Sequence, residues 1–435
     1  MIKADFSTMI KTLQALLKIE SVESSPLPNM PFGKNCAEAL EFVLRLLCDM
    51  GFRVKNLDNY CGYAEIGEGE LFGILGHLDV VPAGNGWTYP PFGATLVDGK
   101  LFSRGAIDDK GPTVACIYAV ARLINEGRKP KKRLRFILGC DEESGWKCME
   151  RYSISEEMPI AGFSPDADFP VINCEKGVVH YTISIKLPKG IVEFSAGTRT
   201  NVVADLSLVK VESSSFPSLI NLNSDASSII ETKDNYIFIK SCGISAHASR
   251  PEEGVNALLK SLHLLSLDSR ELKCIHNAFS KNDGSGCKLD FYDEKSGALT
   301  LNLATAEIKA DVLSFTLDIR FPVSCSKDEI IKILKSTLPF AEITQDSYHL
   351  PLYVAEDAPL VKTLLAAYDR VMGSSSKPIT IGGGTYARVL PLGVAFGPVF
   401  PNTVSTVHQK DEFISLSDLA LITEIYYQAI KDLVF

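Results

Sequence analysis

The stretch Gly76-His77-Leu78-Asp79-Val80-Val81-Pro82 decides the fold of this chain. It follows residues 71–75, a short apolar run bounded by glycine, which predicts a buried strand. Side chains two residues apart lie on the same face of a strand, so His77 and Asp79 point the same way. A histidine beside a carboxylate at the carboxyl edge of a buried sheet is typical of the functional sites of α/β proteins. The alternative is an ordinary strand-end histidine followed by a turn aspartate, and the rest of the chain decides between the two.

The segments around this stretch alternate between helix and strand patterns. Apolar residues at helical spacing predict helices, and short apolar runs predict strands. The alternation predicts an α/β fold with a mainly parallel sheet flanked by helices. The expected helices are residues 6–17, 37–50, 111–127, 358–372 and 417–433, and the expected strands are 52–57, 60–66, 71–76, 133–139 and 394–396.

The pattern changes between residues 177 and 349. Polar and apolar residues alternate there at 180–185, 236–240 and 314–319, as in half-exposed antiparallel strands. Two helical patterns, at 255–267 and 327–338, accompany them. We therefore expect an inserted α+β domain at 177–349, between two parts of one α/β domain at 1–176 and 350–435.

Composition excludes several classes of protein. The 435 residues carry a net charge of −9 without a basic run, which argues against nucleic acid and anionic membranes as partners. The eleven cysteines are scattered, with no C-x-x-C pair, as expected of reduced thiols in the cytoplasm. Lys11 and Lys18 interrupt the N-terminal apolar pattern, so no signal peptide is expected. The apolar stretch at 114–123 contains Arg122 and is too short to span a bilayer.

Polar groups converge at the carboxyl edge of the predicted sheet. Carboxylates packed together raise one another's pKa, and a pair of divalent metals would relieve this repulsion. Nitrogen and oxygen ligands without a thiolate suit zinc, manganese or cobalt. Of two adjacent glutamates in an extended segment, one can bind metal while the other takes a proton from bound water. The converging residues are His77, Asp79, Asp108, Glu142, Glu143, Asp166 and His408.

Six motifs carry a family resemblance over nearly the whole chain. Residues 76–82, 104–112 (RGAIDDKGP) and 141–145 (DEESG) resemble the aminoacylase and carboxypeptidase G family of co-catalytic metallopeptidases. Residues 163–170, 382–388 and 406–412 narrow the resemblance to PepV-type dipeptidases. The resemblance implies a zinc-exopeptidase-like catalytic domain with an inserted lid domain.

The resemblance also implies a role for each residue at the sheet edge. Asp108 would bridge two metals. His77 and Asp166 would bind one of these metals, and Glu143 and His408 the other. Asp79 would orient His77 from behind. Glu142 would be the general base and later the acid.

Further roles fall on the lid and the glycine run. His247, within residues 243–251, would stabilise the oxyanion. Arg320 resembles a clamp for the substrate carboxylate, Asn201 is a weaker match for a lid amide that touches substrate, and Gly382, Gly383 and Gly384 would present backbone N–H groups to the same carboxylate. The remaining histidines, His180, His263, His276 and His349, have no partner motif and are expected to be ordinary.

The implied activity is hydrolysis of dipeptides by a two-metal-activated water, zinc being the expected metal. An N-acyl amino acid deacylase with the same site is one alternative, and a catalytically silent metal-dependent binding protein is another. The length of the insert further predicts a monomer, because the enlarged lid of PepV-type enzymes occupies the place of a second subunit.

Overall fold

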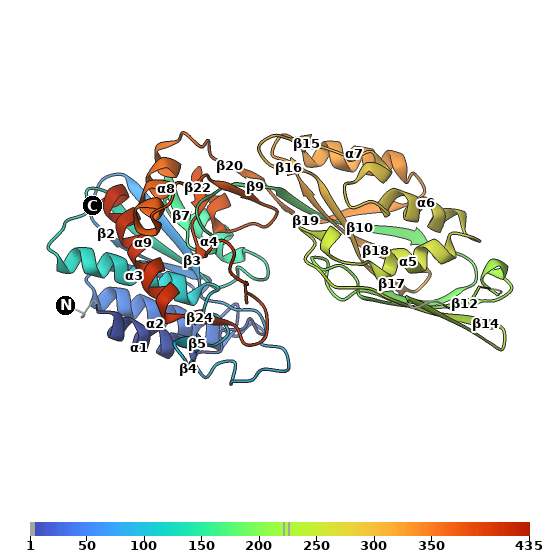
Figure 1. Cartoon of the computed structure of the whole chain (residues 1–435), viewed down its shortest axis with the longest axis horizontal. Coiled ribbons are helices and arrows are strands. Elements are labelled where there is room, and N and C mark those ends of the chain that lie inside the picture. The colour runs from blue at the N-terminus through green and yellow to red at the C-terminus, as the bar shows by residue number, and fades with distance from the viewer. Residues whose placement is uncertain (1–4, 221, 225–226) are drawn as a thin grey trace. The chain divides into compact units, whose positions relative to one another are not determined.

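The computed structural model describes residues 5–220, 222–224 and 227–435, which fall into two compact units (Figure 1). The first unit comprises Met1–Asn173, Leu352–Ile379 and Thr385–Phe435, and the second comprises Cys174–Pro351 and Thr380–Gly384. The sequence predicts that all of 350–435 belongs to the first domain, whereas Thr380–Gly384 groups with the second unit. That segment belongs to the second unit because its backbone and side chains bond there: Ile381 O accepts from Lys176 N, and Thr380 Oγ1 donates to Lys295 O.

The first unit is built on a mixed sheet. Its central strands β6, β3, β7 and β22 run parallel, whereas β1 and β2 on one side and β9 on the other pair antiparallel. The predicted α/β class is thus confirmed, and the parallel part is confined to the centre. The strand order is β1 (Arg53–Leu57), β2 (Cys61–Ile66), β6 (Arg133–Gly139), β3 (Leu71–His77), β7 (Ala161–Ser164), β22 (Leu392–Ala395), β9 (Ile172–Glu175) and β20 (Leu352–Tyr353), with β21 (Ile379–Ile381) pairing β9.

Helices cover this sheet. In Figure 1, α3 lies beside α9, and it also contacts α1. Almost every residue of α3 is buried, which its small and apolar sequence permits. The helices are α1 (Phe6–Leu17), α2 (Lys34–Asp49), α3 (Lys110–Asn125), α4 (Lys147–Ser155), α8 (Pro359–Met372) and α9 (Leu416–Val434), and two small sheets join β24 (Phe413–Ser415), β5 (Lys100–Phe102) and β4 (Thr95–Val97), and β23 (Pro398–Val399) with β8 (Ala167–Asp168).

The central strand β3 positions the site. All of its side chains are buried, as expected of a parallel strand covered on both faces. Its last residue, His77, pairs with Gly139 at the end of β6, so the chain after each strand emerges at the same edge. Gly139 has to be glycine, because a Cβ there would lie 2.3 Å from the Tyr386 hydroxyl. This close approach places Tyr386 directly beneath the sheet edge.

The second unit is an antiparallel sheet with helices packed against it. Apolar side chains of β18 such as Leu317 and Ile319 are in its core, and the alternate residues Asp318 and Arg320 lie on the other face. The strand order is β13 (Ser228–Lys233), β14 (Tyr236–Cys242), β12 (Leu206–Glu212), β11 (Ile191–Ala196), β17 (Thr300–Lys309), β18 (Val312–Phe321), β10 (Gly177–Lys186) and β19 (Glu342–His349), and the helices are α5 (Ala257–Leu265), α6 (Arg270–Phe279) and α7 (Lys327–Thr337).

Two helices were not predicted, α4 and α6. In α6 a readable signal exists: the Ser269 side chain accepts a hydrogen bond from Leu272 N, and Leu272, Ile275 and Phe279 are buried at helical spacing. The remaining elements are the short strands β15 (Tyr292–Asp293) and β16 (Gly297–Ala298) and the 3-10 turns η1 (Pro217–Leu219), η2 (Pro251–Glu253), η3 (Ser285–Cys287) and η4 (Tyr386–Val389). Within the described ranges, no helix combines the length and apolarity needed to cross a membrane.

Candidate metal centre

His77 is held in one tautomer at the end of β3. Its Nδ1 lies 3.0 Å from the backbone oxygen of Asp79, which can only accept a hydrogen bond, so Nδ1 carries the proton. The Asp79 carboxylate, which the resemblance assigned to this task, is farther away, with Oδ1 at 3.6 Å, and its Oδ2 accepts from Glu143 N at 3.0 Å. A backbone carbonyl therefore orients His77, and in the neutral imidazole the lone pair is on Nε2, which faces Asp108 and Asp166.

Asp108 lies between two imidazoles. Its Oδ1 is 2.9 Å from His77 Nε2, and its Oδ2 is 3.0 Å from His408 Nε2. Each oxygen of one carboxylate thus faces a different histidine, which is the arrangement expected of a ligand that bridges two metals. His408 Nε2 is also 2.9 Å from Glu143 Oε1, and His77 Nε2 is 3.4 Å from Asp166 Oδ2.

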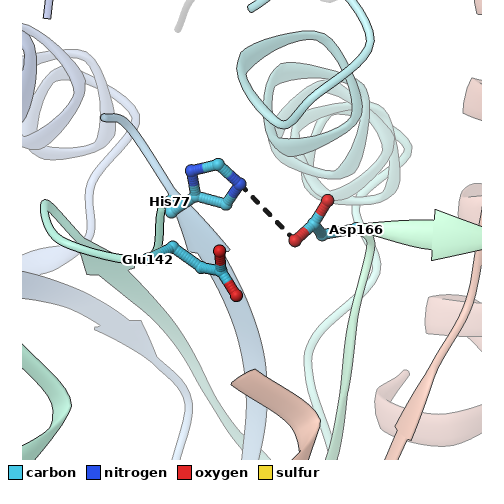
Figure 2. Close-up of side chains that lie close together, drawn as sticks. All are labelled: His77, Glu142 and Asp166. Atoms are coloured by element: carbon cyan, nitrogen blue, oxygen red, sulfur yellow. Dashed lines mark ion pairs between the residues drawn. The ribbon is translucent and has the colours of Figure 1, made fainter. Parts of the chain in front are cut away.

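These groups form two overlapping clusters that could each hold a cation. One contains His77, Glu142 and Asp166, and the other contains His77, Asp108 and Glu143, with the ligand atoms of each cluster within 4.8 Å of one another. Figure 2 shows the first cluster, whose three side chains point toward a common space. Among the described residues, buried His77 Nε2 has no hydrogen bond of good geometry. An imidazole lone pair surrounded by carboxylate oxygens, without a thiolate, fits a divalent metal such as zinc or manganese.

In the absence of metal, protons balance the carboxylates. Partial burial opposes the charge on His408, yet the Asp108 and Glu143 carboxylates raise the pKa of His408 to about 11. Burial likewise opposes the charge on His77, but Asp166 and Asp108 raise the pKa of this histidine well above its usual value. Burial and the Asp108 charge raise the pKa of Glu143 to about 7. A metal entering this centre would have to displace these protons.

Glu142 has its own backbone support. Burial raises the pKa of Glu142 well above its usual value, with Asp166 and Glu143 adding to the shift and His77 opposing it. The indole Nε1 of Trp146 donates a hydrogen bond to Glu142 O at 2.9 Å.

A chain of aromatic contacts runs from Trp146 through Tyr386 to His77, one of the predicted metal ligands. The Trp146 ring packs edge-on against Tyr386, with ring centroids 5.4 Å apart, and Tyr386 packs against His77 with centroids 6.3 Å apart. Sequence reasoning missed both aromatic residues. Their positions in the sequence were the available clue. Trp146 comes four residues after Glu142, and Tyr386 comes two residues after the glycine run.

A buried ion pair connects the two loops that carry Asp108 and His408. Arg104 Nη1 lies 2.7 Å from Glu412 Oε2, and both side chains are excluded from solvent. Arg104 Nη1 also donates to Gln409 O at 3.2 Å, and Glu412 Oε1 accepts from Ile107 N at 3.0 Å. Each member of the pair therefore bonds to the neighbour of a predicted metal ligand. Both residues lie within motifs of the family resemblance, at 104–112 and 406–412, but the resemblance predicts no role for them.

The other predicted site residues lie in the second unit. Arg320 is 6% exposed and donates to Gly382 O at 3.0 Å, which brings the glycine run to this side chain. Asn201 and His247 are exposed and lie in loops joined by backbone hydrogen bonds, one of them from Ala248 N to Asn201 O at 2.9 Å. His247 Nδ1 is 2.7 Å from Ser249 Oγ. The predicted residues of this unit thus form two adjoining groups, one around Arg320 and one around His247, because Gly382 lies against Ser249.

Comparison with known proteins places the chain in a family. Residues 73–432 match the family described as peptidase family M20/M25/M40. A Bacillus subtilis protein named "Putative dipeptidase YtjP" is 40% identical over 452 residues, covering 98% of this chain and 97% of its own. The structure of the M20 family metallo-carboxypeptidase Sso-CP2 from Sulfolobus solfataricus has a TM-score of 0.63 at 17% identity, over 97% of this chain and 98% of that one. Human carnosine dipeptidase 1 has a TM-score of 0.60 at 16% identity, over 98% and 95% of the two chains. The chain belongs to peptidase family M20/M25/M40.

Proposed function

We propose that this protein is a metal-dependent dipeptidase. The observation that carries the proposal is the Asp108 carboxylate, which faces a different imidazole with each of its oxygens, in a cluster with the partly buried Glu142 and Glu143 nearby. The support for dipeptides as substrates is the name of the Bacillus subtilis relative, which is 40% identical over almost the full length of both chains.

The metal ligands in this proposal are four residues of the two clusters, His77, Asp108, Glu143 and Asp166, together with His408, which lies against Asp108 and Glu143. His77 and Asp166 would hold one divalent ion, Glu143 and His408 the other, and Asp108 would bridge them. When bound, such a pair of ions supplies activation of water and polarisation of the scissile carbonyl. The nitrogen and oxygen donors suit zinc first, with manganese and cobalt as alternatives.

The remaining roles fall on side chains that exchange protons or bind the substrate. Glu142 would take a proton from the attacking water and deliver it to the leaving amine, which suits a carboxylate whose pKa is raised by burial. His247 would stabilise the oxyanion, and Asn201 would be a lid amide that touches the substrate. Arg320, with N–H groups from Gly382, Gly383 and Gly384, would bind the terminal carboxylate of the peptide.

The test is turnover by protein stripped of metal and then reloaded with zinc, manganese or cobalt in turn. We expect hydrolysis of several dipeptides in at least one metal form, and little hydrolysis of N-acetyl amino acids. Preference for the acetylated compounds would favour the N-acyl amino acid deacylase instead. Tight binding of dipeptides without turnover in every metal form would favour a silent binding protein.

We also propose that the protein is cytoplasmic and monomeric. The support for the cytoplasm is chemical: every one of the eleven cysteines is a free thiol, and most are buried. The support for a monomer is the long insert, and its test is described in the Discussion.

A further inference from the structure

The guanidinium of Arg320 is held by a carboxylate on its own strand. Arg320 Nε donates to Asp318 Oδ1 and Nη2 donates to Asp318 Oδ2, both at 2.7 Å. Asp318 is fully buried, and despite that burial the charge of Arg320 and the hydrogen bond from His180 lower the pKa of Asp318 to about 2. Asp318 therefore stays ionised across the physiological range and holds the arginine by one edge of its planar fork.

A histidine supports Asp318 from the next strand. His180 of β10 lies directly opposite Asp318 of β18, and its Nε2 is 2.9 Å from Asp318 Oδ2. On the other side of β10, Ser347 of β19 lies opposite His180, with Oγ 2.8 Å from Nδ1. Since the carboxylate can only accept, Nε2 carries the proton whenever His180 is neutral, and Ser347 donates to Nδ1. One continuous chain of hydrogen bonds thus crosses three neighbouring strands and ends on Arg320.

Two of the N–H groups of Arg320 have no acceptor among the residues that the structure describes. The guanidinium has five N–H groups, of which two bond to Asp318 and one to Gly382 O. One N–H on Nη1 and one on Nη2 remain for a further acceptor. A carboxylate takes such a pair of donors as a bidentate ligand. Arg320 can therefore bind an outside carboxylate without giving up Asp318.

The hydrogen bond from His180 to Asp318 affects how strongly Arg320 can bind a substrate carboxylate. Asp318 alone would neutralise the guanidinium and compete with any substrate carboxylate for its N–H groups. A hydrogen bond from His180 to Oδ2 draws part of the Asp318 charge away from Arg320 and fixes the carboxylate plane. Asp318 then fixes the orientation of Arg320 but neutralises only part of its positive charge.

We propose that His180 is a positioning residue for substrate, acting through Asp318 on the Arg320 donors that bind the terminal carboxylate of the peptide. The inference rests on the proposed dipeptidase function and adds to it the residue that tunes recognition of the free carboxylate. His180 itself does not touch the substrate. Its effect should therefore appear only with substrates that have the carboxylate.

The test compares a dipeptide acid with its C-terminal amide in the metal-loaded, full-length protein. His180→Leu removes the donor to Asp318, and we expect KM for the acid to rise about 10-fold, the size of a lost hydrogen bond to a charged group, with kcat within about 2-fold. KM for the amide should stay unchanged. If the amide turns over too slowly, its Ki as a competitor replaces KM.

Five further variants make the test specific. His180→Gln keeps a donor at the Nε2 position and should restore most of the affinity for the acid. Arg320→Met should abolish the preference for acid over amide, and adding His180→Leu to it should change nothing more. His263→Leu, a substitution of an exposed histidine on α5, is the matched control and should behave as wild type. Ser347→Ala gives a milder perturbation should His180→Leu fail to fold.

The outcomes separate the inference from the function on which it rests. Equal changes for acid and amide, or His180→Gln behaving like His180→Leu, would show that His180 is merely structural and overturn the inference. A wild type that prefers the acid, with unchanged preference in His180→Leu, would overturn the inference and leave the dipeptidase standing. A wild type that hydrolyses no dipeptide would overturn the proposed function and the inference together.

Discussion

Glu142 and Glu143 are neighbours in the chain, yet their carboxylates face different groups. Glu143 Oε1 lies 2.9 Å from His408 Nε2, and its backbone N donates to Asp79. Glu142 shares a cluster with His77 and Asp166, and its backbone oxygen accepts from Trp146. The two glutamates therefore have different environments. The Glu143 carboxylate contacts His408, whereas the backbone of Glu142 accepts a hydrogen bond from the Trp146 indole.

The two glutamates should therefore respond differently to substitution. Glu142→Ala should leave the metal content nearly unchanged and lower kcat by about 10²–10⁴-fold, the usual contribution of a general base. Glu143→Ala should lose metal, because it removes a ligand. Elemental analysis together with steady-state kinetics checks both, and Glu142→Gln is the isosteric control. Metal loss in Glu142→Ala with metal retained in Glu143→Ala would show that the two roles are exchanged.

His408 predicts how metal binding depends on pH. In the metal-free protein its pKa is raised to about 11. The unfolded value is about 6.5, so the protonated histidine stabilises the metal-free fold fully below about pH 6.5 and progressively less as the pH rises toward 11. A metal has to displace this proton, so its affinity should fall as the pH falls.

The measurement is the rise in Tm caused by zinc at a fixed free concentration. We expect this rise to be larger at pH 8 than at pH 6. His408→Ala should reduce the difference without abolishing it, because His77 and Glu143 also give up protons to the metal. An equal zinc-induced shift at the two pH values would contradict histidine ligation. Activity at low free metal should decline as the pH falls from 8 to 6.

At the scale of elements, the site depends on loops fastened to the ends of strands. Asp108 precedes α3 and His408 precedes β24, and the buried Arg104–Glu412 pair bonds beside both. Removing one member of a buried pair leaves an uncompensated charge, which costs about 3–5 kcal/mol. Replacing both members with apolar residues avoids that cost but does not restore the hydrogen bonds to Ile107 and Gln409.

Substitutions in the Arg104–Glu412 pair should affect the free energy of unfolding and the affinity for zinc to different degrees. Arg104→Met should lower the free energy of unfolding by about 3–5 kcal/mol. The double variant Arg104→Met/Glu412→Met should recover much of that loss and still bind zinc more weakly than wild type. Chemical unfolding and zinc titration measure the two properties. A double variant with wild-type zinc affinity would show that the pair serves stability alone.

The elements also show what could be predicted from sequence. The strand β3 could be predicted because it is buried on both faces, which leaves a continuous apolar run in the sequence. The helix α1 could be predicted because it is buried along one stripe, which leaves apolar residues at helical spacing. The predicted site residues of the first unit come together because parallel strands end at one edge.

Features that depend on distant partners left no such pattern. Thr380–Gly384 bonds to the second unit, although its neighbours in sequence belong to the first. His180 has no motif of its own, and its register opposite Asp318 and Ser347 gives it its partners. Alternation along β18 does place Asp318 and Arg320 on one face, which was the available clue.

At the scale of the whole molecule, the open question is whether one chain makes a complete enzyme. The second unit, Cys174–Pro351 with Thr380–Gly384, contains a full antiparallel sheet with three α-helices among its described residues. A unit of this size is larger than a single four-stranded lid needs to be. Together with the family resemblance, its length predicts a monomer in which His247 serves the metal centre of its own chain.

Mixing two inactive variants tests this prediction directly. Glu142→Ala lacks the general base and His247→Ala lacks the oxyanion donor, so each chain is defective at a different residue. If His247 acts within its own chain, no combination of the two variants contains a complete site, and the mixture should be as inactive as its components. If His247 served a partner subunit, a mixed dimer would contain one complete site, and up to about a quarter of wild-type activity would return on statistical pairing. Light scattering of the wild type should accordingly give the mass of one chain, 47.5 kDa. Recovered activity in the mixture, or twice that mass, would overturn the prediction of a monomer.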